Sequence, residues 1–145
     1  MFLLDSNVVS ELRSAKRCHP QVREWERETP VDACWLSVIT LLEIRQGIGQ
    51  VAGKDLAFAG VLEHWLEERV KPTFDGRVLA VTPTVAERAG QIAAMRTRSL
   101  ADCLIAATAL EHHLTLVTRN VADFEDLEKL EIVNPWDDSE AGVDR

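Results

Sequence analysis

Four acidic residues are the side chains of this sequence best placed to do chemistry, namely Asp5, Glu43, Asp102 and Asp123. Each follows an apolar run that predicts a β-strand, or lies in the helical pattern after such a run. Carboxylate oxygens are the ligands that hard divalent cations such as Mg²⁺ and Mn²⁺ prefer, with water completing the coordination shell. Clustered carboxylates without a cation would raise one another's pKa. If the fold gathers these residues, the sequence therefore predicts a metal site.

The first two acids also have purely structural explanations. Asp5 could cap the N-terminus of a short helix over residues 8–13, a role that Ser6 would fill equally well. Glu43 has apolar neighbours on a predicted helix, so it either pairs with a cation such as Arg45 or belongs to a polar site. Both alternatives stay open on the sequence alone.

The last two acids lie at predicted helix starts. Ser99 stands three residues before Asp102 and just ahead of an apolar run, which is the spacing of a helix N-terminal cap. Asn120 stands in the same relation to Asp123. The helix dipole favours the anionic form of an acid in the first turn, so capping and metal binding are compatible.

Five short apolar runs predict the strands that position these acids, at residues 2–4, 33–36, 77–81, 114–118 and 131–133. Helical patterns lie between them, which predicts an α/β fold with a mostly parallel sheet. Such sheets bind ligands outside the carboxyl ends of their strands. Ser6 follows the first strand, and Thr118 and Asn120 end or follow the fourth, so we expect these three residues to support the site if the two strands are neighbours.

The composition narrows the function classes. The chain has 145 residues, with 16 Lys and Arg against 24 Asp and Glu, and a formal net charge of −8. This length fits one domain, and the charge argues against coating nucleic acid with a basic face. No stretch approaches the roughly 20 apolar residues of a membrane helix, and the start lacks the basic segment of a signal peptide. We therefore expect a cytoplasmic protein with no membrane partner. The cysteines and histidines lack the spacing of a zinc site.

Four segments, in this order and at these separations, resemble PIN-domain ribonucleases of the VapC type, and within them the FitB-like branch. The segments are LLDSNVVSE at 3–11, LSVITLLEI at 36–44, LADCLIAATA at 100–109, and LTLVTRN at 114–120 followed by DF at 123–124 and NPW at 134–136. The resemblance covers residues 1–136. It departs from the family at Ser6, where Thr is more frequent, and at His113, where Gly is common. His113 would occupy a helix C′ position that needs a positive φ.

The resemblance implies a PIN-like three-layer sandwich, with a five-stranded, mostly parallel sheet flanked by helices and the first strand beside the fourth. It implies a single PIN-like domain over residues 1–136, which leaves 137–145 as a frayed acidic tail. By the same likeness, Asp5, Glu43, Asp102 and Asp123 correspond to the metal-binding catalytic acids of the family.

The implied activity is that of a toxin from a toxin–antitoxin pair. Such a protein is an Mg²⁺- or Mn²⁺-dependent endoribonuclease that hydrolyses RNA phosphodiester bonds with a metal-activated water. The implied partners are RNA, a cognate antitoxin whose extended segment covers the acidic cleft, and a second copy in a homodimer. The helices around Trp25 and Trp65 are candidate contact surfaces, or plain core. We hypothesise that Arg96 or Arg98 contacts RNA phosphate, or neutralises the acidic rim.

Two other functions stay open. A catalytically silent interaction module would keep the PIN fold for its partner alone. A receiver-like domain would accept phosphate on Asp5 beside Mg²⁺, although it would want adjacent acids early in the chain and a lysine after a late strand. Here no early acidic pair is present, and Arg119 follows Thr118.

Overall fold

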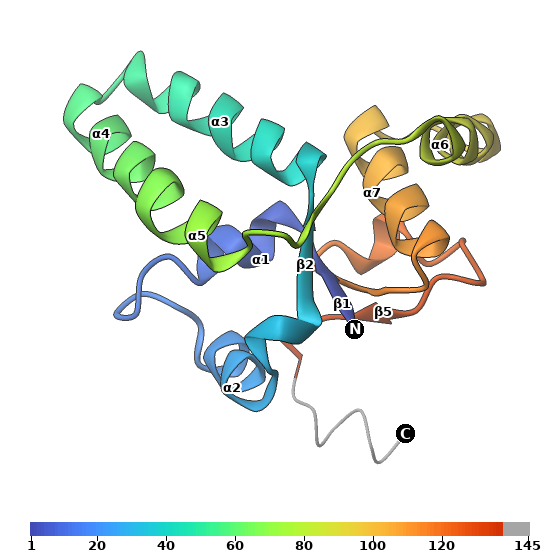
Figure 1. Cartoon of the computed structure of the whole chain (residues 1–145), viewed down its shortest axis with the longest axis horizontal. Helices are drawn as coiled ribbons and strands as arrows, with labels where there is room; N and C mark the ends of the chain where they lie inside the picture. Colours follow the sequence, from blue (N-terminus) through green and yellow to red (C-terminus); the bar gives the residue numbers. More distant parts are fainter. Residues whose placement is uncertain (138–145) are drawn as a thin grey trace.

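Five parallel strands form the centre of the protein, which we describe from a computed structural model over residues 1–137 (Figure 1). The sheet has the order β3-β2-β1-β4-β5. The strands are β1 (Phe2–Leu4), β2 (Cys34–Ser37), β3 (Val78–Leu79), β4 (Thr115–Val117) and β5 (Ile132–Val133). The expected five-stranded sheet is therefore confirmed, with the first strand beside the fourth. The tail expected over 137–145 lies outside the described residues, apart from Asp137.

Seven α-helices and three irregular turns connect the strands within residues 1–137. The helices are α1 (Ser6–Glu11), α2 (Pro20–Glu28), α3 (Val38–Ala52), α4 (Leu56–Trp65), α5 (Lys71–Thr73), α6 (Pro83–Met95) and α7 (Leu100–Glu111). The turns are the 3₁₀ segments η1 (Val31–Ala33) and η3 (Val121–Asp123), and a π-helical turn η2 (Leu66–Val70) between α4 and α5. None of the helices in this range is long and apolar enough to cross a membrane.

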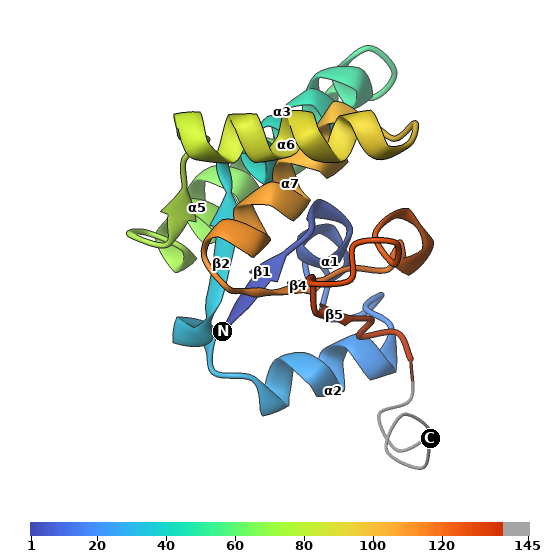
Figure 2. The same ribbon diagram turned by 90° about the vertical axis from the view of Figure 1, so that its right-hand side faces the viewer.

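The sheet separates two apolar cores, because successive side chains of a strand point to opposite faces. Leu3 and Leu116 are register partners and face the core under α6 and α7. Leu4 and Val117, one residue further along, face the core that Val8 of α1 shares with α2, α3 and α4. Figure 2 shows the strands between α7 on one side and α2 on the other, which is the expected three-layer arrangement.

Helix caps at the strand ends set where the acids lie. The Ser37 hydroxyl accepts a hydrogen bond from the Ile39 N–H at 3.0 Å and starts α3 directly after β2. The Ser99 hydroxyl caps α7 in the same way, as the sequence predicts. The carboxyl end of α7 is closed by His113 with φ 55°, which confirms the expected left-handed C′ residue.

Candidate active site

Asp5 lies at the end of β1 and is held by hydrogen bonds although only 3% of it is exposed. Its Oδ1 accepts the Ser6 N–H at 2.8 Å, so Asp5 caps α1 and this helix starts at Ser6 rather than at residue 8. Its Oδ2 accepts the Thr118 hydroxyl at 2.8 Å. That hydroxyl itself accepts the Asn120 N–H at 3.1 Å, which leaves its proton for Asp5. Burial raises the pKa of Asp5, and these hydrogen bonds oppose the rise.

Glu43 faces Asp5 from the second turn of α3. Its Oε1 accepts the Ser6 hydroxyl at 2.9 Å. The ion pair with Arg45 is absent, because the Arg45 guanidinium instead contacts Glu63 and Glu67 at 2.8 Å each. Burial raises the pKa of Glu43, the Ser6 hydrogen bond opposes this, and the nearby carboxylates of Asp5 and Asp102 add to the rise. Glu43 therefore belongs to a polar site and is not paired with Arg45.

Asp102 lies in the first turn of α7, where its N–H donates to the Ser99 hydroxyl at 3.1 Å. Burial raises the pKa of Asp102, Ser99 opposes the rise, and the carboxylates of Asp5 and Asp123 add to it. The cap leaves the carboxyl group free to face Asp5 and Glu43. Capping and membership of the acidic cluster therefore coexist at this residue.

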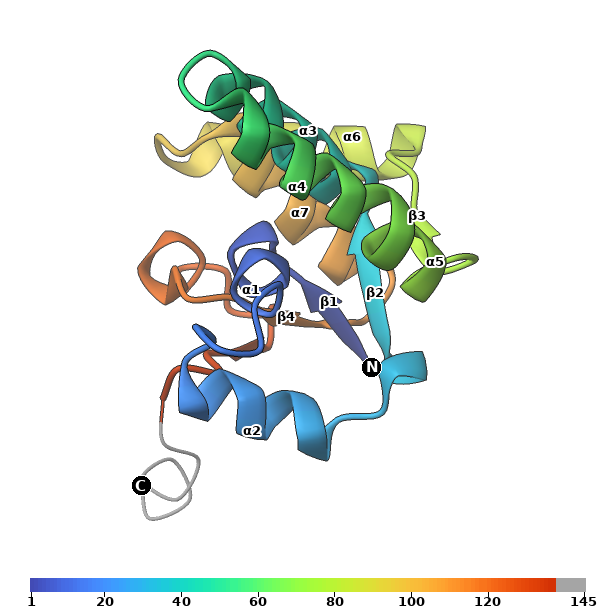
Figure 3. The ribbon, with the colours of Figure 1, turned by 90° about the vertical axis from the view of Figure 1, so that its left-hand side faces the viewer.

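One cavity of about 450 Å³ brings three of the four acids together. Asp5, Glu43 and Asp102 line it, together with Ser6, Asn7 and Asn120. The cavity lies at the carboxyl ends of β1 and β2, beside α3, which Figure 3 shows lying across the end of β2. Asp123 is not among the residues that line it, although its charge contributes to the raised pKa of Asp102.

The chemistry of this cavity fits a hard cation that keeps part of its water shell. No Lys, Arg or His within residues 1–137 forms an ion pair with any of the four acids. In the same range, no three His, Cys, Asp or Glu side chains are close enough to ligate a single ion directly. Mg²⁺ is held in proteins by one or two carboxylates plus several waters, so unpaired and partly separated carboxylates suit it.

The turn that carries Asp123 is fastened by two arginines. The side chain of Arg98 is 2% exposed and donates to both carboxylate oxygens of Asp126, at 3.0 and 2.6 Å. It also donates to the Asp123 carbonyl oxygen at 2.8 Å. Arg96 donates to the Ala122 carbonyl oxygen at 3.0 Å and keeps 41% of its side chain exposed. A contact between Arg98 and an RNA phosphate does not fit this burial. Arg98 neutralises Asp126 instead, whereas Arg96 remains accessible.

Asn7 and Arg119 are site residues that the sequence patterns did not single out. The Asn7 amide donates to Asp5 and to Thr118 at 3.4 Å each, and its oxygen accepts the Arg119 N–H at 3.3 Å. The Arg119 side chain lies over the Trp136 ring, 5.1 Å from its centroid. The signal for Asn7 was its place directly after Asp5 and Ser6 at a strand end. The expected side-chain cap by Asn120 is absent, since only its backbone N–H contacts Thr118.

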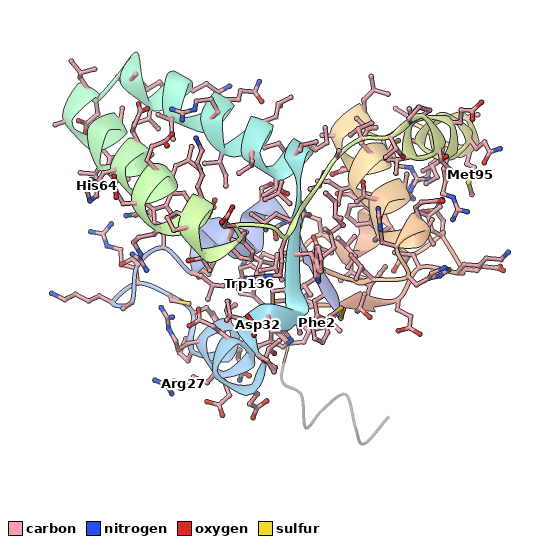
Figure 4. The ribbon with its side chains drawn as sticks, in the orientation of Figure 1. Phe2, Arg27, Asp32, His64, Met95 and Trp136 are labelled. Atoms are coloured by element: carbon pink, nitrogen blue, oxygen red, sulfur yellow. The ribbon has the colours of Figure 1, made fainter. Side chains whose placement is uncertain are left out.

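Histidine and cysteine take no part in the cavity. Neither residue type is among its lining residues within 1–137. His64, labelled in Figure 4, lies on the outer side of α4. Cys34 and Cys103 are buried free thiols, as expected for structural cysteines. The donor set of the cavity is therefore made of oxygens and amides.

The fold and these strand-end carboxylates define a known class of protein. The PIN domain family matches residues 2–130, and the chain belongs to this family.

Two relatives and two solved structures show what the chain is similar to within this family. The chain is 35% identical to Toxin FitB of Neisseria gonorrhoeae over 145 residues, which covers 95% of this chain and 100% of that protein. A crystal structure of FitAcB from the same organism has a TM-score of 0.83 at 33% identity and covers 94% and 99% of the two chains. The chain is 34% identical to a VapC ribonuclease of Sinorhizobium fredii, over 94% and 99% of the two chains. A toxin–antitoxin complex from Klebsiella pneumoniae has a TM-score of 0.65 at 25% identity, over 95% and 100%.

Proposed function

We propose that this protein is a metal-dependent endoribonuclease and the toxin of a toxin–antitoxin pair. The observation that carries the proposal is the cavity in which Asp5, Glu43 and Asp102 gather without a pairing cation. The relatives support it, because one is named a VapC ribonuclease and another a toxin.

Asp5, Glu43 and Asp102 would hold the cation partly through its water molecules, because the three are not close enough to ligate one ion directly. Asp123 would add negative charge near Asp102. Mg²⁺ or Mn²⁺ bound there would supply positive charge for the phosphate group and would lower the pKa of a coordinated water molecule. The chain's own contribution is orientation. Thr118 fixes Asp5, and the Ser6 hydroxyl fixes Glu43 across the cavity.

Two exposed arginines near the acids are candidates for contacts with RNA phosphate groups. Arg96 stays a candidate for a phosphate contact because its side chain is accessible next to the turn of Asp123. Arg119 is a second candidate, since it is exposed and directly follows Thr118, the first residue after β4. A guanidinium there would offset the repulsion between phosphate and the acids.

The partners follow from the same likeness. We infer an antitoxin partner, a homodimer and a cytoplasmic setting in which the toxin meets RNA. A second cavity of about 350 Å³, lined by Trp25, Trp65 and Phe74, is apolar enough to take an antitoxin segment. Leu42 and Leu100, 56% and 72% exposed, are candidate dimer contacts on α3 and α7.

The test is RNA cleavage by the purified chain, freed of any antitoxin, with and without Mn²⁺. The proposal expects cutting that requires the metal and is lost in Asp102→Asn. A chain that binds its antitoxin but cuts no RNA with either metal would instead be a silent interaction module. Stable labelling of Asp5 by acetyl phosphate would favour the receiver-like alternative.

A further inference from the structure

The acidic cavity continues past the carboxylates along α3 and α4. Its far part, here called the neutral end, is lined by Gln46, Gly47 and Gln50 of α3 and by Leu62 and Trp65 of α4. Figure 1 shows these two helices running side by side, away from the sheet. The neutral end contains no ionisable side chain among these five residues.

The helical repeat explains this layout. Gln46, Gly47 and Gln50 follow Glu43 by three, four and seven residues, so all four lie on one face of α3. Gln50 is about 10 Å further along the helix axis than Glu43, at about 1.5 Å per residue. The cavity is therefore long enough for a phosphate at the acids and a neighbouring base at the neutral end.

The side chains there match a nucleobase in their chemistry. Gln46 and Gln50 are exposed, and each amide offers both a donor and an acceptor, which is what the edge of a base requires. Leu62 and the 8% exposed Trp65 supply an apolar wall for its face. The net charge of −8 repels phosphate groups wherever no cation is bound. A part of the cavity that holds no cation therefore suits an uncharged base better than a phosphate.

Gly47 keeps the neutral end open. A Cβ at this position would meet no atom within 4 Å, so the backbone does not require glycine there. Glycine is less favourable than alanine inside a helix, and here its effect is to leave space in the cavity. Gly49 has equally open surroundings on the same helix but does not line the cavity, which makes it a matched control.

We propose that the neutral end is a subsite for one unpaired RNA base beside the cleaved phosphodiester, with Gln46 and Gln50 as the residues that read it. This inference rests on the proposed ribonuclease function. It gives the enzyme a preference for one base next to the cut and for RNA segments whose bases are unstacked.

The experiment uses short single-stranded RNAs that differ only at the two nucleotides flanking the cleaved bond, including an abasic version of each. With the full chain and Mn²⁺, one abasic position lowers kcat/KM about tenfold, as expected for the loss of paired hydrogen bonds to a base. Gln46→Ala, Gln50→Ala and Gly47→Leu show the same loss on intact RNA and no further loss on the abasic RNA. Gly49→Leu cleaves like the unmodified chain.

A binding measurement separates this inference from the proposed function. In an Asp102→Asn background, fluorescence anisotropy reports RNA affinity without turnover, and Gly47→Leu weakens binding of the intact RNA about tenfold but not of the abasic RNA. If Gly47→Leu leaves the affinity for intact RNA unchanged, or lowers the affinity for both RNAs equally, the subsite is overturned. Weaker inhibition by the antitoxin with unchanged RNA binding also overturns it, and assigns the neutral end to the antitoxin. Cleavage that persists in Asp102→Asn contradicts the proposed function alone.

Discussion

Two groups of acids near α3 have opposite surroundings. On α3, Glu43 faces Asp5 and Asp102 with no cation. Arg45, two residues later, instead contacts Glu63 of α4 and Glu67 of η2. Residues two apart on a helix point about 200° apart. The helix thus directs its arginine away from the cavity, and of these two groups only the cavity acids have no ion pair within residues 1–137.

The pKa values follow this division. Burial raises the pKa of Asp5, Glu43 and Asp102. Hydrogen bonds from Lys71 and Arg98 lower the pKa of Glu67 and Asp126, respectively. Paired acids stabilise the fold when they are charged, whereas the cavity acids cost stability when they are charged. This contrast is what a site built for a cation should show.

The largest expected effect is on activity. Asp102→Asn or Glu43→Gln should lower metal-dependent RNA cleavage by at least about 100-fold, since removing even an outer-shell partner of a metal typically costs 10–100-fold. Glu63→Gln, a change of the same size on the paired group, should leave cleavage unchanged. Equal losses in Glu63→Gln and Glu43→Gln would abolish the distinction between the two groups.

The second effect is on metal-linked stability. Mg²⁺ at 100 times its dissociation constant should raise the free energy of unfolding by about 2.7 kcal/mol, because it binds only the folded chain. The melting temperature should rise with Mg²⁺ for the unmodified chain and stay flat for the Glu43→Gln, Asp102→Asn double variant. A comparable rise in the double variant would place the cation elsewhere.

The third effect concerns the ion pair that fastens the turn of Asp123. Arg98→Ala should lower the free energy of unfolding by about 2 kcal/mol, because it removes charge-assisted hydrogen bonds from a buried side chain. Urea denaturation measures this change. Arg98→Lys keeps the positive charge but not the bidentate contact with Asp126, so it should recover part of the lost stability. Full stability in Arg98→Ala would show that the turn holds without its arginine.

The fourth effect is on the pH dependence of stability without metal. The raised pKa values of the cavity acids mean that the folded state binds more protons, so their charging lowers stability as pH rises from about 4 through the raised values. Glu43→Gln should therefore melt higher than the unmodified chain at neutral pH in EDTA, and the gap should close on acidification. The paired Asp126 should behave oppositely, since its contribution is lost as pH falls through its lowered pKa. Thermal melts from about pH 2 to 8 distinguish the two signs, because the loss from Asp126 occurs below about pH 4.

The smallest effect is expected at the exposed ion pairs of Arg45 with Glu63 of α4 and Glu67 of η2. Glu63→Gln with Glu67→Gln should leave the melting temperature almost unchanged, because exposed ion pairs are screened by water and salt. A large loss of stability there would show that the paired group also holds α3 against α4.

Much of this arrangement could be predicted from local patterns. The caps at Ser37 and Ser99 and the left-handed His113 depend on residues within one turn, which the sequence displays directly. The neighbourhood of the first and fourth strands came from the family likeness and is confirmed by the Leu4–Val117 register.

The contacts that the sequence did not reveal join residues far apart in the chain. Arg98 pairs with Asp126, 28 residues away, and Arg45 pairs with Glu63, 18 residues away. Neither separation matches a helical or strand periodicity, so the sequence does not predict these pairs. The role of Asn7 likewise depends on Thr118, 111 residues away. Charged and polar side chains have several possible partners, and only the tertiary fold selects one.

The bond between Thr118 and Asp5 joins residues that are 113 positions apart, and it has a consequence for biosynthesis. Strand β1 lies at the middle of the sheet and pairs with β4, which leaves the ribosome long after β1 does. A growing chain that has not yet delivered β4 lacks the hydroxyl that fixes its first acid. Translation order therefore completes the surroundings of Asp5 only after β4 has left the ribosome.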